Sequence, residues 1–212
     1  MNSSELGRQI SEEFFYGRGT DIAKDLVGKF LINKETQAGG IIVETEAYLG
    51  ENDPSCHFAK NRENRKKIFR MGAGTVYVYK IRGHNCMNII SEYKGNPEGV
   101  LIRAIKPVKG IEGMGERRGW EDKGKLASGP GKLTEALGIN KEKHNGRKIS
   151  ESSITIYHTD IDPEIEITSR IGISKACDWP TRFSIKNNSY ISKTGKQPDT
   201  SLDLDSYYQK LE

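Results

Sequence analysis

The sequence predicts a single α+β domain, in which a curved, mainly antiparallel sheet packs against helices and carries a protruding β-hairpin. Three observations lead to this fold class. The 212 residues suit one sizeable domain, because domains commonly hold roughly 100–200 residues. Segments with the alternation or composition of strands outnumber helical segments, and turns containing glycine separate them. No internal repeat and no low-complexity tract interrupts this order.

The first predicted element is a helix that Thr20 and Asp21 can cap. Its apolar residues keep to one face: Ile22, Leu26, Val27 and Phe30. Gly39 and Gly40 then mark a turn before an alternating strand over residues 41–48. A period of two places one set of side chains on the first face: Ile41, Val43, Thr45 and Ala47. It places the other set on the second face: Ile42, Glu44, Glu46 and Tyr48.

A hairpin and several shorter elements follow. Residues 75–81 form a predicted strand with Tyr77 and Tyr79 on one face, and Gly83 marks the turn into a returning strand. The returning and later strands are expected at 85–91, at 100–105 closed by Pro107, and at 153–158, 164–169 and 182–185. Helices are expected at 109–118 and at 132–137, which Gly138 stops. The predicted domain spans 14–193, between polar tails at 1–13 and 194–212.

Basic residues concentrate in the middle of the chain. The net charge is only +4, but residues 60–132 hold 17 Lys and Arg against 7 Asp and Glu. This distribution suits a surface that follows a phosphate backbone, and it equally suits a solvated charged face. The candidate DNA contacts in this section include Arg65, Lys66, Lys67 and Lys132.

The cysteines and the apolar segments indicate a cellular location. An odd number of widely separated cysteines, Cys56, Cys86 and Cys177, favours reduced thiols over a disulfide framework. No apolar run of about 18 residues and no secretion signal is visible. We therefore expect a cytoplasmic protein without membrane contact, associated with the nucleoid when bound to DNA. The Cys and His spacing lacks the pairs typical of zinc ligands, so no metal is expected. No cofactor and no obligatory protein partner is expected either.

Two acidic side chains on one strand face indicate possible chemistry. Glu44 and Glu46 would lie roughly 7 Å apart, at about 3.3 Å per residue, close enough to raise the pKa of at least one of them. Such a carboxylate can act as a general base. Two exposed glutamates on the wet face of an edge strand would show the same pattern. Tyr48 and the nearby His57 favour a site, because they add an aromatic wall and a second polar group.

The motifs form an ordered series over most of the chain. The series begins with 42–50 (IVETEAYLG), Asp53-Pro54 and His57, and continues with Tyr77-Val78-Tyr79, Gly83, Cys86-Met87-Asn88, Leu101-Ile102-Arg103-Ala104, Pro107, 128–133 (SGPGKL) and Ala136-Leu137. It resembles the alkyladenine (3-methyladenine) DNA glycosylase family. Residues 14–31 and 170–183 resemble the opening and closing motifs of that family, so the resemblance spans about residues 14–192.

The resemblance implies an activity and a fold. The fold would be similar to the C-terminal domain of methionyl-tRNA formyltransferase. The enzyme would flip an alkylated or deaminated purine out of double-stranded DNA and hydrolyse its bond to the sugar. The lesion remains open among 3-methyladenine, 7-methylguanine, hypoxanthine and ethenoadenine.

The resemblance also implies roles for individual residues. Glu46 corresponds to the base that activates water, with Glu44 in support. Tyr48 and His57 fall on one side of the base pocket and Tyr79 on the other. Asn88 corresponds to a selectivity residue at the pocket floor, and Arg103 to an arginine that helps to hold the DNA and the catalytic network. Arg82 stands before Gly83, where the family usually has an aromatic wedge, in a hairpin one residue shorter than usual.

Three other functions have to be weighed against this one. A non-catalytic nucleic-acid binding module of the same fold would keep a basic face but would not need Glu46 with Tyr48 and Tyr79. A hydrolase of free nucleosides would have no use for the basic section. A Schiff-base lyase step is compatible with the many lysines, although the resemblance implies a water nucleophile.

Overall fold

The computed structural model describes residues 7–57, 63, 67, 70–119, 125–193, 196 and 208. The strands are β1 (Phe30–Asn33), β2 (Ala38–Tyr48), β3 (Thr75–Ile81), β4 (His84–Tyr93), β5 (Asn96–Lys109), β6 (Arg147–Lys148), β7 (Ile154–Tyr157), β8 (Ile165–Thr168) and β9 (Arg182–Ile185). The helices are α1 (Gly19–Leu26), α3 (Ile111–Arg117), α4 (Pro130–Leu137) and α5 (Lys141–His144), with 3₁₀ turns η1 (Glu12–Phe15) and η2 (Gly50–Asn52).

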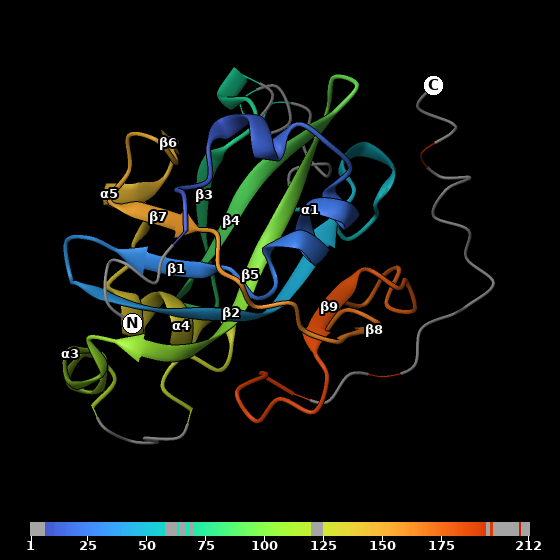
Figure 1. Ribbon diagram of the computed structural model, residues 1–212. Coiled ribbons are helices and arrows are strands. Elements are labelled where there is room, and N and C mark those ends of the chain that lie inside the picture. The colour runs from blue at the N-terminus through green and yellow to red at the C-terminus, as the bar shows by residue number, and fades with distance from the viewer. Residues whose placement is uncertain are drawn as a thin grey trace.

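The strands pair antiparallel in one curled sheet, which confirms the predicted α+β fold. The order along the sheet is β6-β3-β4-β5-β2-β1-β7, and the pair β8 and β9 joins it at β2. One edge of β2 is shared, because its first half pairs with β1 and its second half pairs with β9. The long strands β2, β4 and β5 cross the middle of the molecule, with β8 and β9 to one side (Figure 1).

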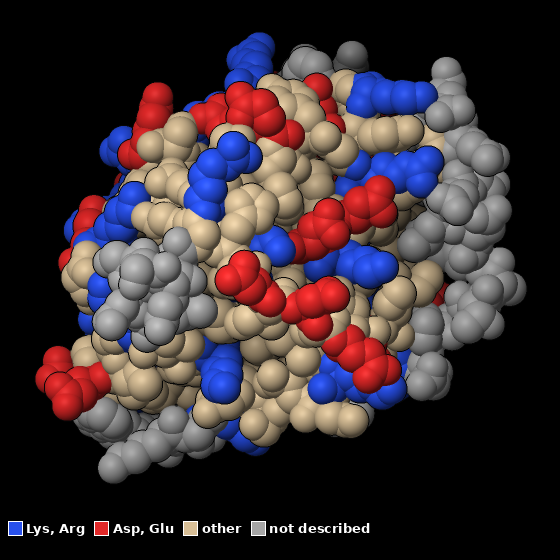
Figure 2. Space-filling view, viewed as in Figure 1, with Lys and Arg blue, Asp and Glu red and all other residues tan. Residues whose placement is uncertain are grey.

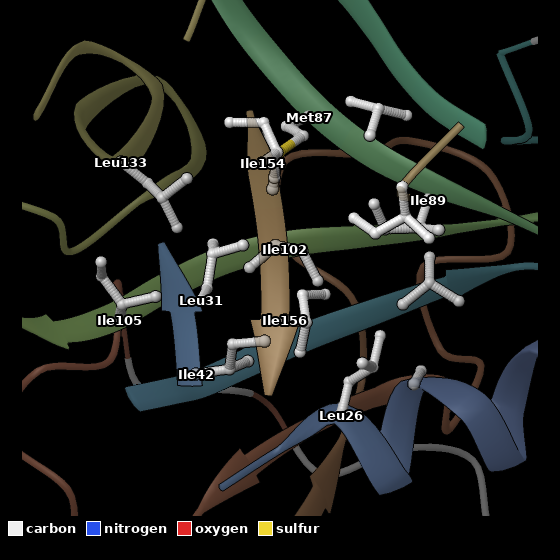
Figure 3. Close-up of a cluster of buried hydrophobic side chains, with 14 of the residues drawn as sticks. Leu26, Leu31, Ile42, Met87, Ile89, Ile102, Ile105, Leu133, Ile154 and Ile156 are labelled. Carbon is white, nitrogen blue, oxygen red and sulfur yellow. The ribbon is translucent and has the colours of Figure 1, made fainter. Parts of the chain in front are cut away.

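The main hydrophobic core lies between the sheet and the helices α1 and α4. Figure 3 shows Leu26 of α1 and Leu133 of α4 on two sides of this cluster. The other labelled side chains come from β1, β2, β4, β5 and β7. Burying one such side chain contributes about 1.5–3 kcal/mol. The core therefore fixes β2 and β5, the two strands that carry the acidic residues and Arg103.

The predicted start of α1 is wrong. The helix begins at Gly19, so Thr20 and Asp21 lie in its first turn and do not cap it. The N-cap position belongs to Arg18, whose side chain has no acceptor oxygen. The amide of Gly19 donates instead to the carboxylate of Glu98 at 2.6 Å. A side chain from the distant strand β5 thus accepts the hydrogen bond that a neighbouring residue was expected to accept.

Two other predicted boundaries are also wrong. α1 ends at Leu26, because Gly28 has a φ of 91° that a continuing helix cannot adopt. Phe30 therefore begins β1 and does not extend the apolar face of the helix. Pro107 does not close a strand, since it lies inside β5 opposite Gly40. The pairing is irregular at that point, which accommodates a residue without an amide proton.

The pairing of β2 with β5 contains two adjoining irregularities. The ladder skips Val43 on β2 and Arg103 on β5. Each is the extra residue of a β-bulge, and the alternation of each strand changes phase there. A bulge next to a site commonly serves to re-aim a side chain. These two bulges direct Glu44 and Arg103 toward each other.

The phase change overturns part of the predicted facing pattern. The main core receives side chains from both halves of β2: Ile42, Thr45 and Ala47. A second apolar cluster on the other face receives Ile41 and Val43. Ile42 thus does not share a face with the glutamates, because the bulge lies between them. The predicted grouping of Glu46 with Tyr48 is confirmed by a hydrogen bond between their side chains.

The predicted hairpin and most later elements are confirmed, although β5 extends well beyond the predicted strand 100–105, and α5 and β6 were not predicted. β3 has the expected bounds, and the turn to β4 consists of Arg82 and Gly83 alone. Both have left-handed backbones, with φ of 50° and 85°, as in a type I′ turn. α4 starts at Pro130, two residues earlier than expected, and Gly138 follows it with a φ of 67°. The strands β7, β8 and β9 lie within the predicted ranges.

Two buried side chains come from the segments expected to be tails. Ile10 belongs to the main core, and its amide donates to the carbonyl of Ile156 in β7. Tyr208 is 1% exposed, and its hydroxyl donates to Glu98 at 3.1 Å. The guanidinium of Arg18 lies 4.7 Å from the centre of the Tyr208 ring. These contacts join both ends of the described chain to the domain.

Candidate active site

A cavity of about 850 Å³ borders the face of the sheet that carries the acidic residues. Its lining combines β3, β4 and β5 with the turn before α4 and with residues 171–175 and 192–193. The predicted site residues that line it are Tyr48, His57, Tyr79, Arg82, Asn88, Arg103 and Lys132. Segments that are distant in the sequence therefore meet around one space, and nearly all the predicted substrate contacts belong to it.

Glu46 lies directly behind the cavity wall. Its side chain has no exposed surface. One carboxylate oxygen, Oε2, accepts from the Tyr48 hydroxyl at 2.9 Å and from Arg103 Nη1 at 3.1 Å. The other, Oε1, accepts from the amide of Ile171 at 2.7 Å. All three donor residues line the cavity, so Glu46 is held by the residues that separate it from the open space.

Arg103 bridges the two glutamates. Its Nε donates to Glu44 at 2.7 Å and its Nη1 to Glu46. Arg182 of β9 donates to Glu44 as well, at 2.9 Å. The four side chains form a buried chain of alternating charge with no net charge. Such an arrangement compensates the desolvation of each member.

The increase in pKa that was expected for at least one of the two glutamates does not occur at Glu44. Burial favours the neutral form of this carboxyl, but the guanidinium groups of Arg103 and Arg182 outweigh burial and hold the pKa of Glu44 below its ordinary value. The amide of Ser192 adds a hydrogen bond to the ionised form at 2.6 Å. Glu44 is therefore a fixed anion whose partners come from β5, β9 and the segment after β9, which strand spacing alone could not reveal.

The aromatic residues are distributed between the two walls of the cavity differently from the prediction. The rings of His57 and Tyr79 are stacked, with centroids 4.5 Å apart and an interplanar angle of 8°. A base inserted between two rings needs about 7 Å, two contacts of about 3.5 Å. His57 and Tyr79 therefore belong to the same wall of the cavity, and the expected placement of His57 beside Tyr48 is wrong.

Tyr77 is a site residue that the sequence interpretation missed. Its hydroxyl lies 3.0 Å from His57 Nδ1, and it lines the cavity. Burial raises the pKa of Tyr77 to about 12, so the hydroxyl keeps its proton at neutral pH. The signal in the sequence was its shared strand face with Tyr79.

Asn88 presents an unsatisfied polar group to the cavity. The side chain is 4% exposed, and its Nδ2 has no hydrogen-bond partner within the described part of the chain. Buried amide groups in folded proteins almost always have a partner. An amide that lines a cavity without one is suited to donate to a ligand.

A buried ion pair supports the wall formed by Tyr48. Arg170 donates to both carboxylate oxygens of Asp53, at 2.5 and 3.0 Å, and neither side chain is exposed. Asp53 also accepts from the amides of Leu49 and Ser55, which shapes the loop that leads to His57. The sequence motif that contains Asp53 indicates no role for it, because its partner Arg170 lies more than a hundred residues away.

Basic side chains surround the cavity. Arg82 at the hairpin tip, Lys132, Lys175 and Lys193 line it, and the last two were missed by the sequence interpretation. Lys67 is exposed, while Arg65 and Lys66 lie outside the described residues. On the face drawn in Figure 2, acidic and basic side chains are interspersed.

The described residues contain neither a cluster of metal ligands nor a membrane-spanning helix. Within the described residues, no group of three or more His, Cys, Asp or Glu side chains could hold a metal ion. None of the three cysteines forms a disulfide. Among the same residues, no helix has the length and apolar character to cross a membrane.

Comparisons with known proteins identify relatives over most of the chain. The model of the methylpurine-DNA glycosylase (MPG) family matches residues 13–189. A provisionally named 3-methyladenine DNA glycosylase from Francisella tularensis (strain SCHU S4) is 48% identical over 181 residues, which cover 82% of this chain and 93% of that protein. A protein of the same name from Methanoculleus marisnigri is 41% identical over 187 residues, covering 84% and 96% of the two chains. Another, from Prosthecochloris aestuarii, is 39% identical over 201 residues, covering 92% and 96%.

Proposed function

The chain belongs to the methylpurine-DNA glycosylase family, and from this membership and the site geometry we propose that it flips alkylated or deaminated purines out of duplex DNA and hydrolyses their N-glycosidic bond with water activated by Glu46. The resemblance inferred from the sequence motifs is confirmed. So is the class of enzyme, a DNA glycosylase of base-excision repair, which is a hydrolase of N-glycosyl bonds. The base flipping, the water and the residue roles are the proposal.

One observation carries the proposed mechanism. Glu46 is a buried carboxylate whose orientation is fixed by three donors that line the cavity. Oε2 accepts two hydrogen bonds and Oε1 accepts one, so Oε1 retains a lone pair for a further proton. When a residue of the cavity wall moves aside, a water reaches Oε1 and transfers a proton to it as the water oxygen forms a bond to the anomeric carbon of the sugar. The glycosidic bond breaks, and its electron pair leaves with the purine. General base catalysis of this kind typically contributes 10²–10⁴-fold.

The aromatic walls support recognition of a flipped base. A purine between Tyr48 and the stacked pair of His57 and Tyr79 would contact an aromatic face on each side. Alkylated purines carry positive charge, and a cation over an aromatic ring gains about 0.5–2 kcal/mol. The unpartnered amide of Asn88 can donate to an acceptor on the base edge. Undamaged bases lack the charge, and their extrusion from the stack costs a few kcal/mol that a damaged base partly avoids.

The surface around the cavity suits a DNA backbone. Arg82, Lys132, Lys175 and Lys193 can neutralise phosphates on either side of a flipped nucleotide. Arg82 also occupies the hairpin tip, from which its planar guanidinium could fill the gap that the nucleotide leaves. We propose from their charge that Arg65, Lys66 and Lys67 also contact DNA.

A non-catalytic binding module accounts less well for the site. Binding requires basic and aromatic side chains, but it does not require two buried carboxylates held by two buried arginines. Burying ions without excellent compensation costs several kcal/mol each. The fixed Glu46 beside the cavity therefore favours the enzyme.

The decisive experiment is a panel of duplexes that each carry one lesion at a known position. We expect alkali-cleavable abasic sites in at least one of the duplexes with 3-methyladenine, 7-methylguanine, hypoxanthine or ethenoadenine, and none in an undamaged duplex. The activity should survive chelation. Strand breaks without alkali would indicate a Schiff-base lyase step. Binding of every lesion without any abasic site would favour the non-catalytic module.

A further inference from the structure

Tyr48 separates the cavity from a buried cation. The guanidinium carbon of Arg170 lies 4.6 Å from the centre of the Tyr48 ring and 5.6 Å from the centre of the Trp179 ring. Tyr48 lines the cavity, whereas Arg170 is 4% exposed and does not line it. Arg170 therefore contacts Tyr48 from behind, and a base stacked on Tyr48 from the cavity would face the same ring from the other side.

The carboxylate of Asp53 neutralises the charge of the Arg170 guanidinium. Both of its oxygens accept from Arg170, and neither side chain has exposed surface, so solvent contributes no screening. The remaining guanidinium bonds go to neutral backbone carbonyls, those of Ala47 and Ala176. The pair presents no net charge to Tyr48. Without Asp53, Tyr48 would be backed by an uncompensated positive charge.

We propose that the Asp53–Arg170 pair determines how strongly the base pocket prefers cationic over neutral purines. The inference rests on the proposed function, because it concerns the base that stacks on Tyr48. A stacked base would lie roughly 8 Å from the guanidinium, the observed 4.6 Å plus a stacking distance of about 3.5 Å. A unit charge at that distance in a medium of effective dielectric near 20 changes an equilibrium roughly 30-fold, and a charge a few Å farther away, as that of Asp53 is, changes it about tenfold. The effect acts on a charged base and leaves a neutral base unaffected.

The test measures a ratio of two activities in each variant. Single-turnover excision is followed on two duplexes, one with cationic 7-methylguanine and one with neutral hypoxanthine. If the unmodified protein does not excise hypoxanthine, the ratio is taken between the dissociation constants of the 7-methylguanine duplex and of a duplex with neutral ethenoadenine, whose fluorescence reports its own insertion between the rings. The variants are Asp53→Asn, Arg170→Gln and the double variant. Each ratio is taken within one variant, so a general loss of stability or activity cancels.

The proposal predicts opposite shifts for the two single variants. Asp53→Asn leaves the positive charge of Arg170 without its counterion. It lowers the ratio of activity on the cationic lesion to activity on the neutral lesion about tenfold. Arg170→Gln leaves the negative charge of Asp53 without its counterion and raises the same ratio. The double variant restores a neutral pair and returns the ratio to within about threefold of the original. If Asp53→Asn fails to fold, Arg170→Gln still gives a signed result.

A matched control makes the same change in net charge elsewhere on the cavity. Glu135→Gln leaves Arg118 without its ion-pair partner, at a place that lines the cavity but does not back Tyr48. It should move both activities together and leave their ratio unchanged. Ratios within about twofold of the original in both single variants of the pair would overturn the proposal, and the pair would then be purely structural. Absence of excision by the unmodified protein would instead refute the proposed function.

Discussion

The Glu46 side chain is held in one orientation before substrate binds. Its two oxygens accept from a tyrosine hydroxyl, a guanidinium and a backbone amide, and all three donors belong to different segments of the chain. Burial, together with the charge on Glu46, raises the pKa of Tyr48 well above its ordinary value, so the Tyr48 hydroxyl remains a donor. The carboxylate is therefore already oriented for the reaction, and only the wall between it and the water has to move.

Replacing Glu46 with glutamine tests its role directly. Glu46→Gln keeps the shape of the side chain but cannot take a proton from water. We expect excision to fall at least about 100-fold, in line with loss of a general base, while binding of a lesion duplex changes little. Single-turnover rates and gel-shift titrations measure the two effects. Excision within tenfold of the unmodified protein would place the base elsewhere, and Glu44 would be the next candidate.

Tyr77 offers a second test at the scale of one atom. Tyr77→Phe removes the hydroxyl that contacts His57 Nδ1 but keeps the ring. Loss of one hydrogen bond contributes about 1 kcal/mol, so we expect affinity for a lesion duplex to fall about fivefold. The rate at saturating enzyme should change less. An unchanged dissociation constant would mean that stacking on Tyr79 alone positions His57.

The β3–β4 hairpin is the element that we propose to enter the DNA. Its turn has only two residues, both with left-handed backbones, so a substitution at Arg82 must tolerate a φ near 50°. Asparagine tolerates this conformation better than alanine does. Arg82→Asn therefore removes the guanidinium and keeps the turn.

We expect Arg82→Asn to slow excision from duplex DNA at least fivefold more than from a single strand, in which no base stack has to be held open. Arg82→Tyr should restore or improve duplex activity, because a ring wedges with more surface and less hydration to lose. Paired rates on the two substrates measure this difference. Equal losses on both would make Arg82 a phosphate contact, and His84, which lines the cavity beside it, would become the candidate wedge.

Strand and hairpin positions could be predicted because alternation and turn residues are local signals. The phase change in β2 could not, because Val43 and Arg103 are ordinary strand residues in composition, and only their pairing makes them bulges. The cap of α1 also comes from a distant strand, through Glu98. Motif resemblance identified the residues around the cavity, but it could not show that His57 stacks on Tyr79. Each of these three failures concerns a contact between segments far apart in the sequence, whereas the early end of α1 has a local cause in Gly28.

At the scale of the whole molecule, Glu98 links stability to pH. Burial raises the pKa of Glu98 from an ordinary value of 4.5 to about 7 in the folded protein. The folded state therefore holds a proton between these values that the unfolded state releases. The contribution is fully present below about pH 4.5 and is lost as the pH rises through 7. Its size is roughly 3 kcal/mol.

Glu98→Gln isolates this contribution, since glutamine stays neutral at every pH. We expect the difference in unfolding free energy between the two proteins to change between about pH 4.5 and 7, with the unmodified protein losing stability relative to the variant as the pH rises. Urea unfolding at several pH values measures it. A difference that does not vary with pH would show that Glu98 does not bind a proton in this range.

The basic section should make DNA binding depend steeply on salt. Each neutralised phosphate adds about 0.9 to the slope of log affinity against log salt. Replacing Arg65, Lys66 and Lys67 with alanine should flatten the slope by up to about 3. Fluorescence anisotropy at several salt concentrations gives both slopes. An unchanged slope would move the DNA surface to Lys132, Lys175 and Lys193.

The paired bulges in β2 and β5 set where this chain can change length over evolution. Val43 and Arg103 are skipped by the ladder, so loss of either one would leave the pairs on both sides of it in register. Loss of a paired residue such as Thr45 would instead shift the later pairs by one position and exchange their inner and outer side chains. At this level the sheet therefore tolerates a deletion only at the two bulges, where the deletion removes Arg103 itself or the irregularity beside Glu44, so the sheet would keep its pairing while the site lost a charge or its alignment.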